Sequence, residues 1–189
     1  MIEAANSQKF SFIHQPGISV GGHCIPIYPQ FYLWSDPTAN LIKEARELNK
    51  EMATYCINDI QEQLGNLTDM NILVVGVSYR NGVKETAYSG AFEIQKLLIE
   101  KNANPMFYDD LYQAEEIKDL GLPFFNGVLQ DIDCIIIHND SKFIEELFKK
   151  SLPKLRLIYF GRNIKFNDDL YSRFSVRSLG RTEQSKNFH

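Results

Sequence analysis

Short apolar runs alternate with helical patterns from residue 70 to residue 180, and this alternation constrains the fold more than any other feature. Residues 72–77 form a continuous apolar run, which is typical of a strand buried on both faces of a sheet. Similar patterns predict strands at 105–109, 134–137 and 155–159, and helices at 88–101, 114–119 and 143–149. Strands that alternate with helices over short loops predict an α/β protein with a Rossmann-like, doubly wound parallel sheet.

A long helix is predicted before this sheet, at residues 38–64. Asp36 and Pro37 suit its start, and glycine at position 65 suits its end. Its apolar residues recur every three or four positions and form one stripe: Leu41, Ala45, Leu48, Met52, Cys56, Ile60 and Leu64. Such a helix extends roughly 40 Å, which is more than a compact domain needs. It is either a core helix that overhangs the domain or a connector and dimerisation spine, and the two are compatible.

The chain divides into four segments. Residues 1–35 are rich in glycine, proline and aromatic residues and are expected to be irregular, with a packed aromatic loop at 28–34. Residues 36–66 hold the long central helix, and residues 67–181 hold the Rossmann-like domain. Residues 182–189 form a polar tail that is expected to be frayed.

Composition excludes several classes of function. A net charge of −4 disfavours a large nucleic-acid footprint. The three cysteines are scattered without a CxxC pair, so neither a zinc site nor a disulfide framework is predicted, and a reducing compartment fits best. No apolar run approaches the roughly 18 residues that span a bilayer, and the first residues do not resemble a secretory signal. We therefore expect a cytoplasmic protein.

Two arginines are expected at one edge of the sheet. Arg80 follows the first predicted strand and Arg162 follows the fourth, and ligands of open parallel sheets bind beyond the carboxyl ends of the strands. Arginine forks suit phosphate oxygens, so this edge could hold a nucleotide diphosphate. The alternative is that both are exposed loop residues that pair with Asp109 or Glu85. The first strand–helix turn has neither G-x-G-x-x-G nor a Walker motif, so no standard phosphate loop for NAD or ATP is predicted.

One cysteine lies in a glycine-rich turn. Cys24 follows Gly21-Gly22-His23, where a backbone without bulky side chains lets a ligand come close, and this setting suits a nucleophilic thiolate. Cys56 and Cys134 lie in apolar elements and are expected to serve packing. An independent thiol hydrolase or transferase built on the histidine–cysteine pair is a weaker alternative, because adjacent side chains rarely face each other. His23 is expected to pack or to form local hydrogen bonds. For His14 and His138 structural and ligand-binding roles both stay open, and for His138, which follows a strand, a structural hydrogen bond is favoured over a ligand contact.

Two blocks together resemble the UDP-glucose/GDP-mannose dehydrogenase family, and most closely its branch that acts on UDP-N-acetylhexosamines. Residues 15–26 are similar to the family's catalytic-cysteine segment and read Gln-Pro-Gly-Ile-Ser-Val-Gly-Gly-His-Cys-Ile-Pro. Residues 75–90 are similar to the first turn of its C-terminal UDP-binding domain and read Val-Gly-Val-Ser-Tyr-Arg-Asn-Gly-Val-Lys-Glu-Thr-Ala-Tyr-Ser-Gly. The order of cysteine loop, long helix and second Rossmann-like domain also agrees, over roughly residues 1–180.

The resemblance implies a two-fold, NAD-dependent oxidation of the sugar C6 alcohol to a uronate for surface polysaccharide. Cys24 would attack the C6 aldehyde, hydride transfer would leave a thioester, and water would hydrolyse it. Contacts to the UDP-sugar would come from Gly17, Gly21, Gly22, Arg80 and Arg162. The long helix would form a homodimer core. Arg46 and Asn49 on that helix either orient neighbouring loops or, the safer interpretation, lie on the surface.

The chain also departs from the family. Many members have an aspartate at the Tyr28 position and an arginine at the Ala87 position, which concern hydrolysis and a substrate contact. Residues 1–189 do not contain the family's NAD-binding domain with G-x-G-x-x-G, so the resemblance implies that NAD binds mainly outside this chain, on a separate domain or chain. We therefore expect no dehydrogenase activity from this polypeptide alone. The alternative function is a non-catalytic UDP-sugar-binding or dimerisation module.

Overall fold

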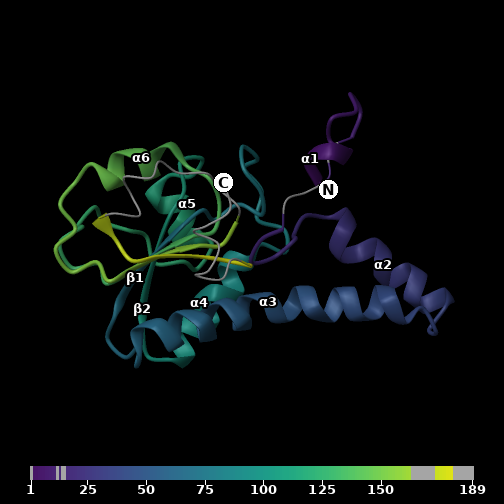
Figure 1. Ribbon diagram of the computed structural model, residues 1–189, viewed down its shortest axis with the longest axis horizontal. Helices are drawn as coiled ribbons and strands as arrows, with labels where there is room; N and C mark the ends of the chain where they lie inside the picture. The colour runs from purple at the N-terminus through teal and green to yellow at the C-terminus, as the bar shows by residue number, and fades with distance from the viewer. Residues whose placement is uncertain (1, 12, 14–15, 163–172, 181–189) are drawn as a thin grey trace.

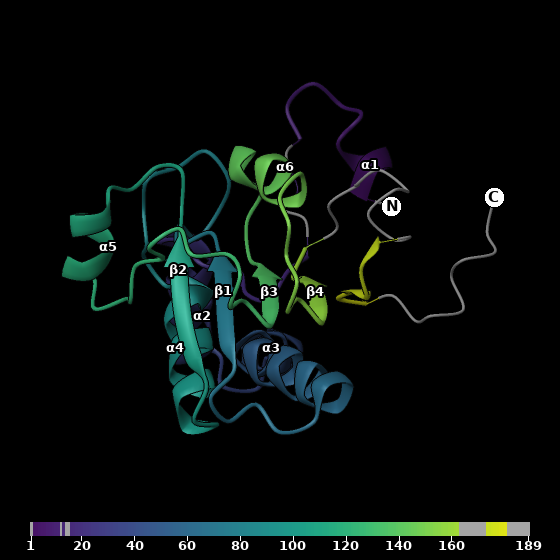
Figure 2. The same cartoon turned by 90° about the vertical axis from the view of Figure 1, so that its left-hand side faces the viewer.

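The computed structural model describes residues 2–11, 13, 16–162 and 173–180. Its centre is a five-stranded parallel sheet in the order β2-β1-β3-β4-β5. The strands are β1 (Asn71–Val75), β2 (Asn104–Tyr108), β3 (Cys134–Ile137), β4 (Leu157–Phe160) and β5 (Val176–Ser178). Figure 2 shows β2, β1, β3 and β4 side by side in that order. The strand order reverses between β1 and β3, which is the position where ligands bind in open sheets of this class.

Helices cover both faces of the sheet, so the predicted α/β class with a doubly wound parallel sheet is confirmed. One face of β1 and β3 packs with α3 (Asn40–Leu64) and α4 (Gly90–Glu100), and the other packs with α6 (Lys142–Phe148). The short helix α5 (Ala114–Asp119) follows β2. Neighbouring residues of β1 point to opposite faces, since Ile72 and Val74 belong to one core cluster and Leu73 and Val75 to the other.

The helices α2 (Cys24–Ser35) and α3 form an arm that extends away from the sheet (Figure 1). The carboxyl half of α3 lies under the sheet, where Cys56, Ile57 and Ile60 are fully buried. The amino half packs against α2, and Leu41 and Leu48 remain 84% and 61% exposed. The predicted apolar stripe of the long helix is therefore buried only along its second half.

The prediction of an irregular segment at residues 1–35 holds for the described residues between 6 and 23 but is wrong at residues 2–5 and 24–35. A short helix, α1 (Ile2–Ala5), lies near the start, and residues 24–35 form α2 rather than a packed aromatic loop. The aromatic residues of α2 are also not packed, because this helix leans on α3 with one side only. Tyr28, Phe31 and Trp34 are 64%, 62% and 86% exposed.

The long helix begins two residues later than predicted. Asp36 does not cap it, because its Oδ1 accepts hydrogen bonds from the backbone N–H and the hydroxyl of Thr38 in a preceding turn. Ala39 is the N-cap residue, and Gly65, with a φ of 84°, ends the helix as predicted. Within the described part of the chain, no helix is both long and apolar enough to cross a bilayer. The predicted polar tail at 182–189 and His14 lie outside the described residues.

Candidate functional site

The cysteine-bearing segment, residues 16–24, lies against the carboxyl edge of the sheet. Ile18 donates its backbone N–H to the carbonyl of Gly161 at 3.0 Å, directly after β4. Gly22 donates to the carbonyl of Ala87 at 2.8 Å, in the loop between β1 and α4. These two bonds bring residues 17–22 to the edge at which the sequence predicts ligand binding.

The Asn49 side chain of α3 also binds this segment. Asn49 Oδ1 accepts the backbone N–H of Val20 at 2.9 Å, and its Nδ2 donates to the Val20 carbonyl at 3.5 Å. The interpretation of Asn49 as a surface helix residue is therefore wrong, and the alternative role in orienting a loop is the one observed. Periodicity could not reveal this role, since Asn49 lies off the apolar stripe and its partner is a backbone group 29 positions away.

Glycine is required at positions 21 and 22 by their neighbours. A Cβ at Gly21 would lie 2.5 Å from the carbonyl oxygen of Tyr88, and one at Gly22 would lie 2.9 Å from the ring of Tyr79. Gly22 also has a φ of 90°, which L side chains rarely adopt. A Cβ at Gly17 would likewise lie 2.9 Å from Cγ of Arg162. These close approaches are to protein atoms, and contact of the three glycines with a sugar stays a prediction.

Cys24 is the first residue of α2 and its side chain is exposed. The other two cysteines are buried, and burial raises the pKa of Cys56 to about 11 and raises the pKa of Cys134 further. The neighbouring His23 places Nε2 3.4 Å from Glu85 Oε2. Backbone N–H of Ala87, the His23 side chain and backbone N–H of Thr86 hold the pKa of Glu85 below its usual value. His23 therefore contacts a side chain of the loop after β1, and Cys24, whose side chain is exposed, is the next residue.

The Arg162 side chain forms hydrogen bonds with backbone carbonyls of the protein. Its Nε donates to the carbonyl of His138 at 2.9 Å, and its Nη2 donates to the carbonyls of Tyr79 at 3.1 Å and Ser19 at 3.4 Å. Burial lowers the pKa of this guanidinium from its usual value. The side chain thus joins the cysteine segment to the loops after β1 and β3. A direct contact of Arg162 with a phosphate stays a prediction.

Arg80 lies on the same edge but faces solvent. Its guanidinium carbon lies 5.8 Å from the ring centroid of Tyr79, the residue whose carbonyl Arg162 contacts. Among the described contacts, neither arginine pairs with Asp109 or Glu85, so the alternative of loop ion pairs is not what the structure shows. The two arginines lie at the same edge of the sheet, as predicted, but Arg80 is exposed and Arg162 is largely buried.

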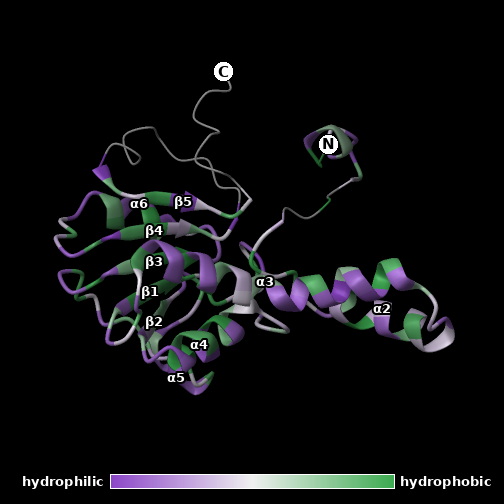
Figure 3. Cartoon of the chain, turned by 60° about the horizontal axis from the view of Figure 1, so that its bottom comes forward, coloured by the Kyte–Doolittle hydropathy of each residue, from purple (hydrophilic) through white to green (hydrophobic). Residues whose placement is uncertain are grey.

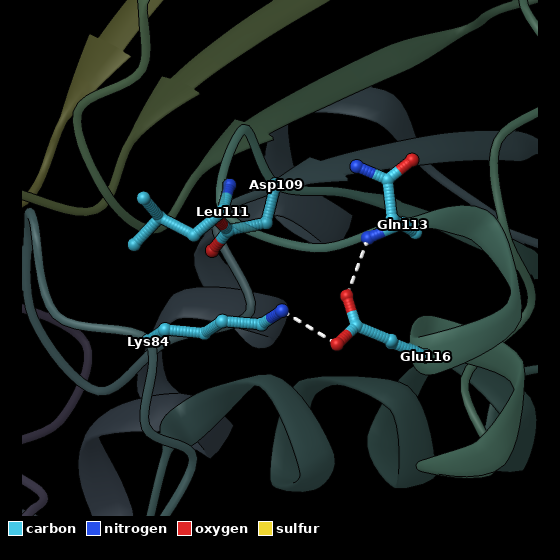
Figure 4. Close-up of polar contacts among 5 residues, drawn as sticks. All are labelled: Lys84, Asp109, Leu111, Gln113 and Glu116. Carbon is cyan, nitrogen blue, oxygen red and sulfur yellow. Dashed lines mark hydrogen bonds and ion pairs between the residues drawn. The ribbon is translucent and has the colours of Figure 1, made fainter.

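The loop after β1 is held by acidic side chains from the next strand and helix (Figure 4). Asp109 Oδ2 accepts the backbone N–H groups of Val77 at 2.7 Å and Ser78 at 3.0 Å, and its Oδ1 accepts that of Leu111 at 2.9 Å. Further out, Lys84 contacts Glu116 at 2.5 Å, and Glu116 also accepts the backbone N–H of Gln113 at 2.8 Å.

These contacts show whether this edge of the sheet is suited to bind NAD. In dinucleotide-binding sheets, an acidic residue about 20 residues after the glycine-rich turn binds the ribose hydroxyl. Here both carboxylate oxygens of Asp109, which directly follows β2, accept hydrogen bonds from backbone N–H groups of this chain. With no G-x-G-x-x-G in the turn, this edge does not fit the adenosine half of NAD.

His138 is a structural histidine. It is fully buried after β3, and its Nδ1 lies 3.1 Å from the carbonyl oxygen of Gly76. Burial, with a smaller contribution from Arg162, lowers the pKa of His138 to about 3, so the imidazole is neutral at physiological pH. Of the two roles left open for this residue, the structural hydrogen bond is observed.

Sequence comparison gives the class of the protein. Residues 73–167 match the profile of the UDP-glucose/GDP-mannose dehydrogenase family, UDP binding domain. This chain therefore belongs to that family, and the sheet with its β1–α4 loop is a UDP-binding domain. The resemblance drawn from the two sequence blocks is confirmed.

Comparison with individual proteins shows which members of the family this chain resembles. The chain is 33% identical over 191 residues to UDP-N-acetyl-D-mannosamine dehydrogenase of Methanococcus vannielii, with 95% of this chain and 43% of that protein covered. Among solved structures it resembles UDP-D-ManNAc dehydrogenase from Pyrococcus horikoshii at 28% identity and a TM-score of 0.69, covering 95% of this chain and 43% of the other. The UDP-N-acetyl-mannosamine dehydrogenase of Staphylococcus aureus gives 26% identity and a TM-score of 0.62 over 95% and 42%. The chain spans less than half the length of these relatives and matches their C-terminal part.

Proposed function

We propose that this chain is the UDP-binding and cysteine-bearing part of a dehydrogenase that oxidises the C6 alcohol of a UDP-N-acetylhexosamine to a uronate for surface polysaccharide. The observation that carries the proposal is the contact between the two blocks. Gly22 bonds Ala87, and Gly21 packs against Tyr88, so Cys24 is presented beside the loop that bears Arg80. The names of the mannosamine dehydrogenases that match this chain support the substrate class.

Cys24 is the proposed nucleophile. Its sulfur is exposed at the first residue of a 12-residue helix, and the positive end of a helix favours an anion such as a thiolate. Attack on the C6 aldehyde forms the S–C bond, and the carbonyl oxygen takes a proton to give a thiohemiacetal held on the protein. NAD, when bound, would be the oxidant of both stages, accepting one hydride from the C6 alcohol to give the aldehyde and another from the thiohemiacetal to give the thioester. Attack of water on the resulting thioester then frees the thiol and leaves the carboxylate.

NAD binds, in this proposal, mainly outside residues 1–189, because Asp109 and the loop after β1 do not fit a dinucleotide. The polypeptide alone is then inactive, and a separate domain or chain supplies the nicotinamide beside the sugar. Purified chain incubated with NAD and UDP-N-acetylhexosamines should form no NADH. Turnover in that assay would show that this part of the proposal is wrong.

Arg80 is the proposed phosphate ligand. Its guanidinium is exposed on the β1–α4 loop, where it can form paired hydrogen bonds with a diphosphate. Calorimetric titration with UDP and with UDP-N-acetylmannosamine should show binding, and Arg80→Ala should weaken it by about tenfold. Lys150→Ala, at an exposed position two residues after the end of α6, serves as the control for lost positive charge. No heat with either nucleotide would overturn the proposed UDP site.

A homodimer through the arm is the proposed assembly. Large apolar side chains recur at intervals of seven along the exposed side of α3, at Leu41, Leu48 and Tyr55, which are 84%, 61% and 56% exposed. Figure 3 shows hydrophobic stretches along both helices of the arm. Sedimentation should give a dimer that Leu48→Glu converts to a monomer, whereas Glu47→Ala, a change at an exposed polar position, should not. A monomeric wild-type chain would remove this proposal.

A non-catalytic module is the second candidate. It is favoured by Tyr28, which occupies the family's aspartate position and lies on α2 with its ring 64% exposed and 6.4 Å from that of Phe31. The 6-aldehyde of the UDP-sugar, labelled with ¹³C at C6, separates the two candidates. A thiohemiacetal carbon resonance that disappears in Cys24→Ser supports the dehydrogenase. Binding of UDP without any adduct supports the module.

A further inference from the structure

Two buried polar atoms without hydrogen-bond partners lie around one point at the start of α4. They are Ser19 Oγ on the cysteine segment and His138 Nε2 after β3, and neither has a partner in the structure. A Cβ built on Gly90 would lie 2.5 Å from Ser19 Oγ and 3.1 Å from His138 Nε2. Buried side-chain polar atoms are nearly always hydrogen-bonded, directly or through water, so this pair calls for a link.

The tautomer of His138 follows from its other nitrogen. Nδ1 lies 3.1 Å from the carbonyl oxygen of Gly76, which can only accept a hydrogen bond. The proton of the neutral ring is therefore on Nδ1, and Nε2 carries a lone pair. A serine hydroxyl is a donor that suits this lone pair.

We propose that one buried water accepts from the Ser19 hydroxyl and donates to His138 Nε2, and that this link positions the cysteine segment on the sheet. Ser19 and His138 are thus positioning residues for Cys24, five residues beyond Ser19. The significance of that positioning for catalysis rests on the proposed function, whereas the link itself does not.

The link adds a polar side-chain contact to a segment whose other hydrogen bonds are made by its backbone, with the Ile18 side chain buried in the core. Ile18 is bonded to Gly161, Val20 to Asn49 and Gly22 to Ala87. Ser19 lies between the first two anchors, and its own carbonyl accepts from Arg162 at 3.4 Å. Arg162 also donates to the carbonyl of His138. Its side chain therefore already connects the backbone carbonyls of Ser19 and His138.

Gly90 leaves the room that the link needs. It is the first residue of α4 and is buried, and any larger residue would place a carbon at the point between the two polar atoms. Gly90→Ala therefore separates Ser19 from His138 without removing either partner. This substitution gives a third way to break the same contact.

A double-mutant cycle tests the proposal on the full chain. Ser19→Ala removes the donor, and His138→Asn keeps a donor for Gly76 but lacks the Nε2 acceptor. Each single change should raise the amide exchange rates of Ile18 and Gly22, and the alkylation rate of Cys24, by about fivefold, the effect of one lost hydrogen bond. The double variant should show no further increase. Ser151→Ala, at an exposed serine after α6, is the matched control and should change neither rate.

Nitrogen NMR of the wild-type chain gives an independent readout, which keeps the proposal testable if His138→Asn fails to fold. At pH 7, His138 should be neutral with its proton on Nδ1. A proton on Nε2, or additive effects of the two changes, or unchanged rates in Ser19→Ala, would each overturn the link. Titration with UDP separates the outcomes: binding with an additive cycle rejects the link alone, and a coupled cycle without UDP binding rejects the proposed function alone.

Discussion

Arg162 Nε donates a hydrogen bond to the main-chain carbonyl of His138 at 2.9 Å, so a side chain that follows β4 holds the backbone that follows β3. The same guanidinium reaches Tyr79 and Ser19, which belong to the UDP-binding domain and the cysteine segment. One buried cation therefore fixes the relative position of the two parts that the proposed chemistry requires.

Arg162→Ala should lower the free energy of unfolding by about 3 kcal/mol, because it removes hydrogen bonds from a largely buried charged donor. Urea denaturation followed by circular dichroism measures this change. Arg80→Ala is the matched control, since that side chain is exposed, and it should alter the free energy of unfolding by no more than about 0.5 kcal/mol. Equal losses in the two variants would contradict the structural role of Arg162.

The three cysteines should differ in reactivity. Cys24 is exposed, whereas Cys56 and Cys134 are fully buried and burial raises the pKa of both thiols. Because the thiolate is the reactive form, native protein at pH 8 should react with one equivalent of iodoacetamide, and denatured protein with three. Intact mass and peptide mapping count and locate the adducts. In Cys24→Ser, the fast reaction should disappear, and a second fast thiol would show that one of the buried cysteines is accessible.

The sheet could be predicted from the sequence because its strands are continuous apolar runs. Residues 134–137 are buried on both faces, so apolar content alone marks the strand. β5 was missed, since it has three half-buried residues with Arg177 in the middle. Its position depends on Asp59 of α3, a partner 118 positions away that no local pattern reveals.

The candidate site was predicted in part for a related reason. That Arg80 and Arg162 share an edge follows from the rule that parallel strands end together. Which of them is exposed does not follow, because the carbonyls that surround Arg162 come from three separate segments. The helical form of residues 24–35 was also missed, since proline is typical of loops. Pro26 lies in the first turn of α2, where proline is tolerated, and Pro29 lies inside the helix, where it is rare.

Asp59 should be important for the edge of the sheet. Arg177 Nε lies 2.8 Å from both carboxylate oxygens of Asp59, and Asp59 is 8% exposed. Asp59→Ala should lower the free energy of unfolding by about 3 kcal/mol, because it leaves a partly buried guanidinium without its carboxylate. Urea denaturation checks the value against Glu62→Ala, an exposed carboxylate on the same helix, which should cost no more than about 0.5 kcal/mol. A loss as small as that of the control would mean that the pair contributes nothing to stability.

Stability should fall in mild acid because of His138. Burial lowers the pKa of His138 to about 3 in the folded protein, whereas the free side chain titrates near 6.5. Between these values the unfolded state binds more protons, so the free energy of unfolding decreases as the pH falls below 6.5, by up to about 1.4 kcal/mol per pH unit. Urea denaturation at pH 7.5 and pH 5 should therefore differ by about 2 kcal/mol on account of this one residue.

His138→Asn isolates that contribution, because asparagine does not titrate and still donates to Gly76. Its free energy of unfolding should be lower than that of wild type at pH 7.5, and the difference should shrink at pH 5. Hydrogen bonds hold the pKa of Glu85 and of Glu116 below its usual value, and because both carboxylates are present in the two proteins their contribution cancels in this comparison. Parallel pH profiles for the two proteins would mean that the imidazole can take up a proton while the protein stays folded. That result would contradict the structure, because a fully buried ring beside the Arg162 cation disfavours protonation.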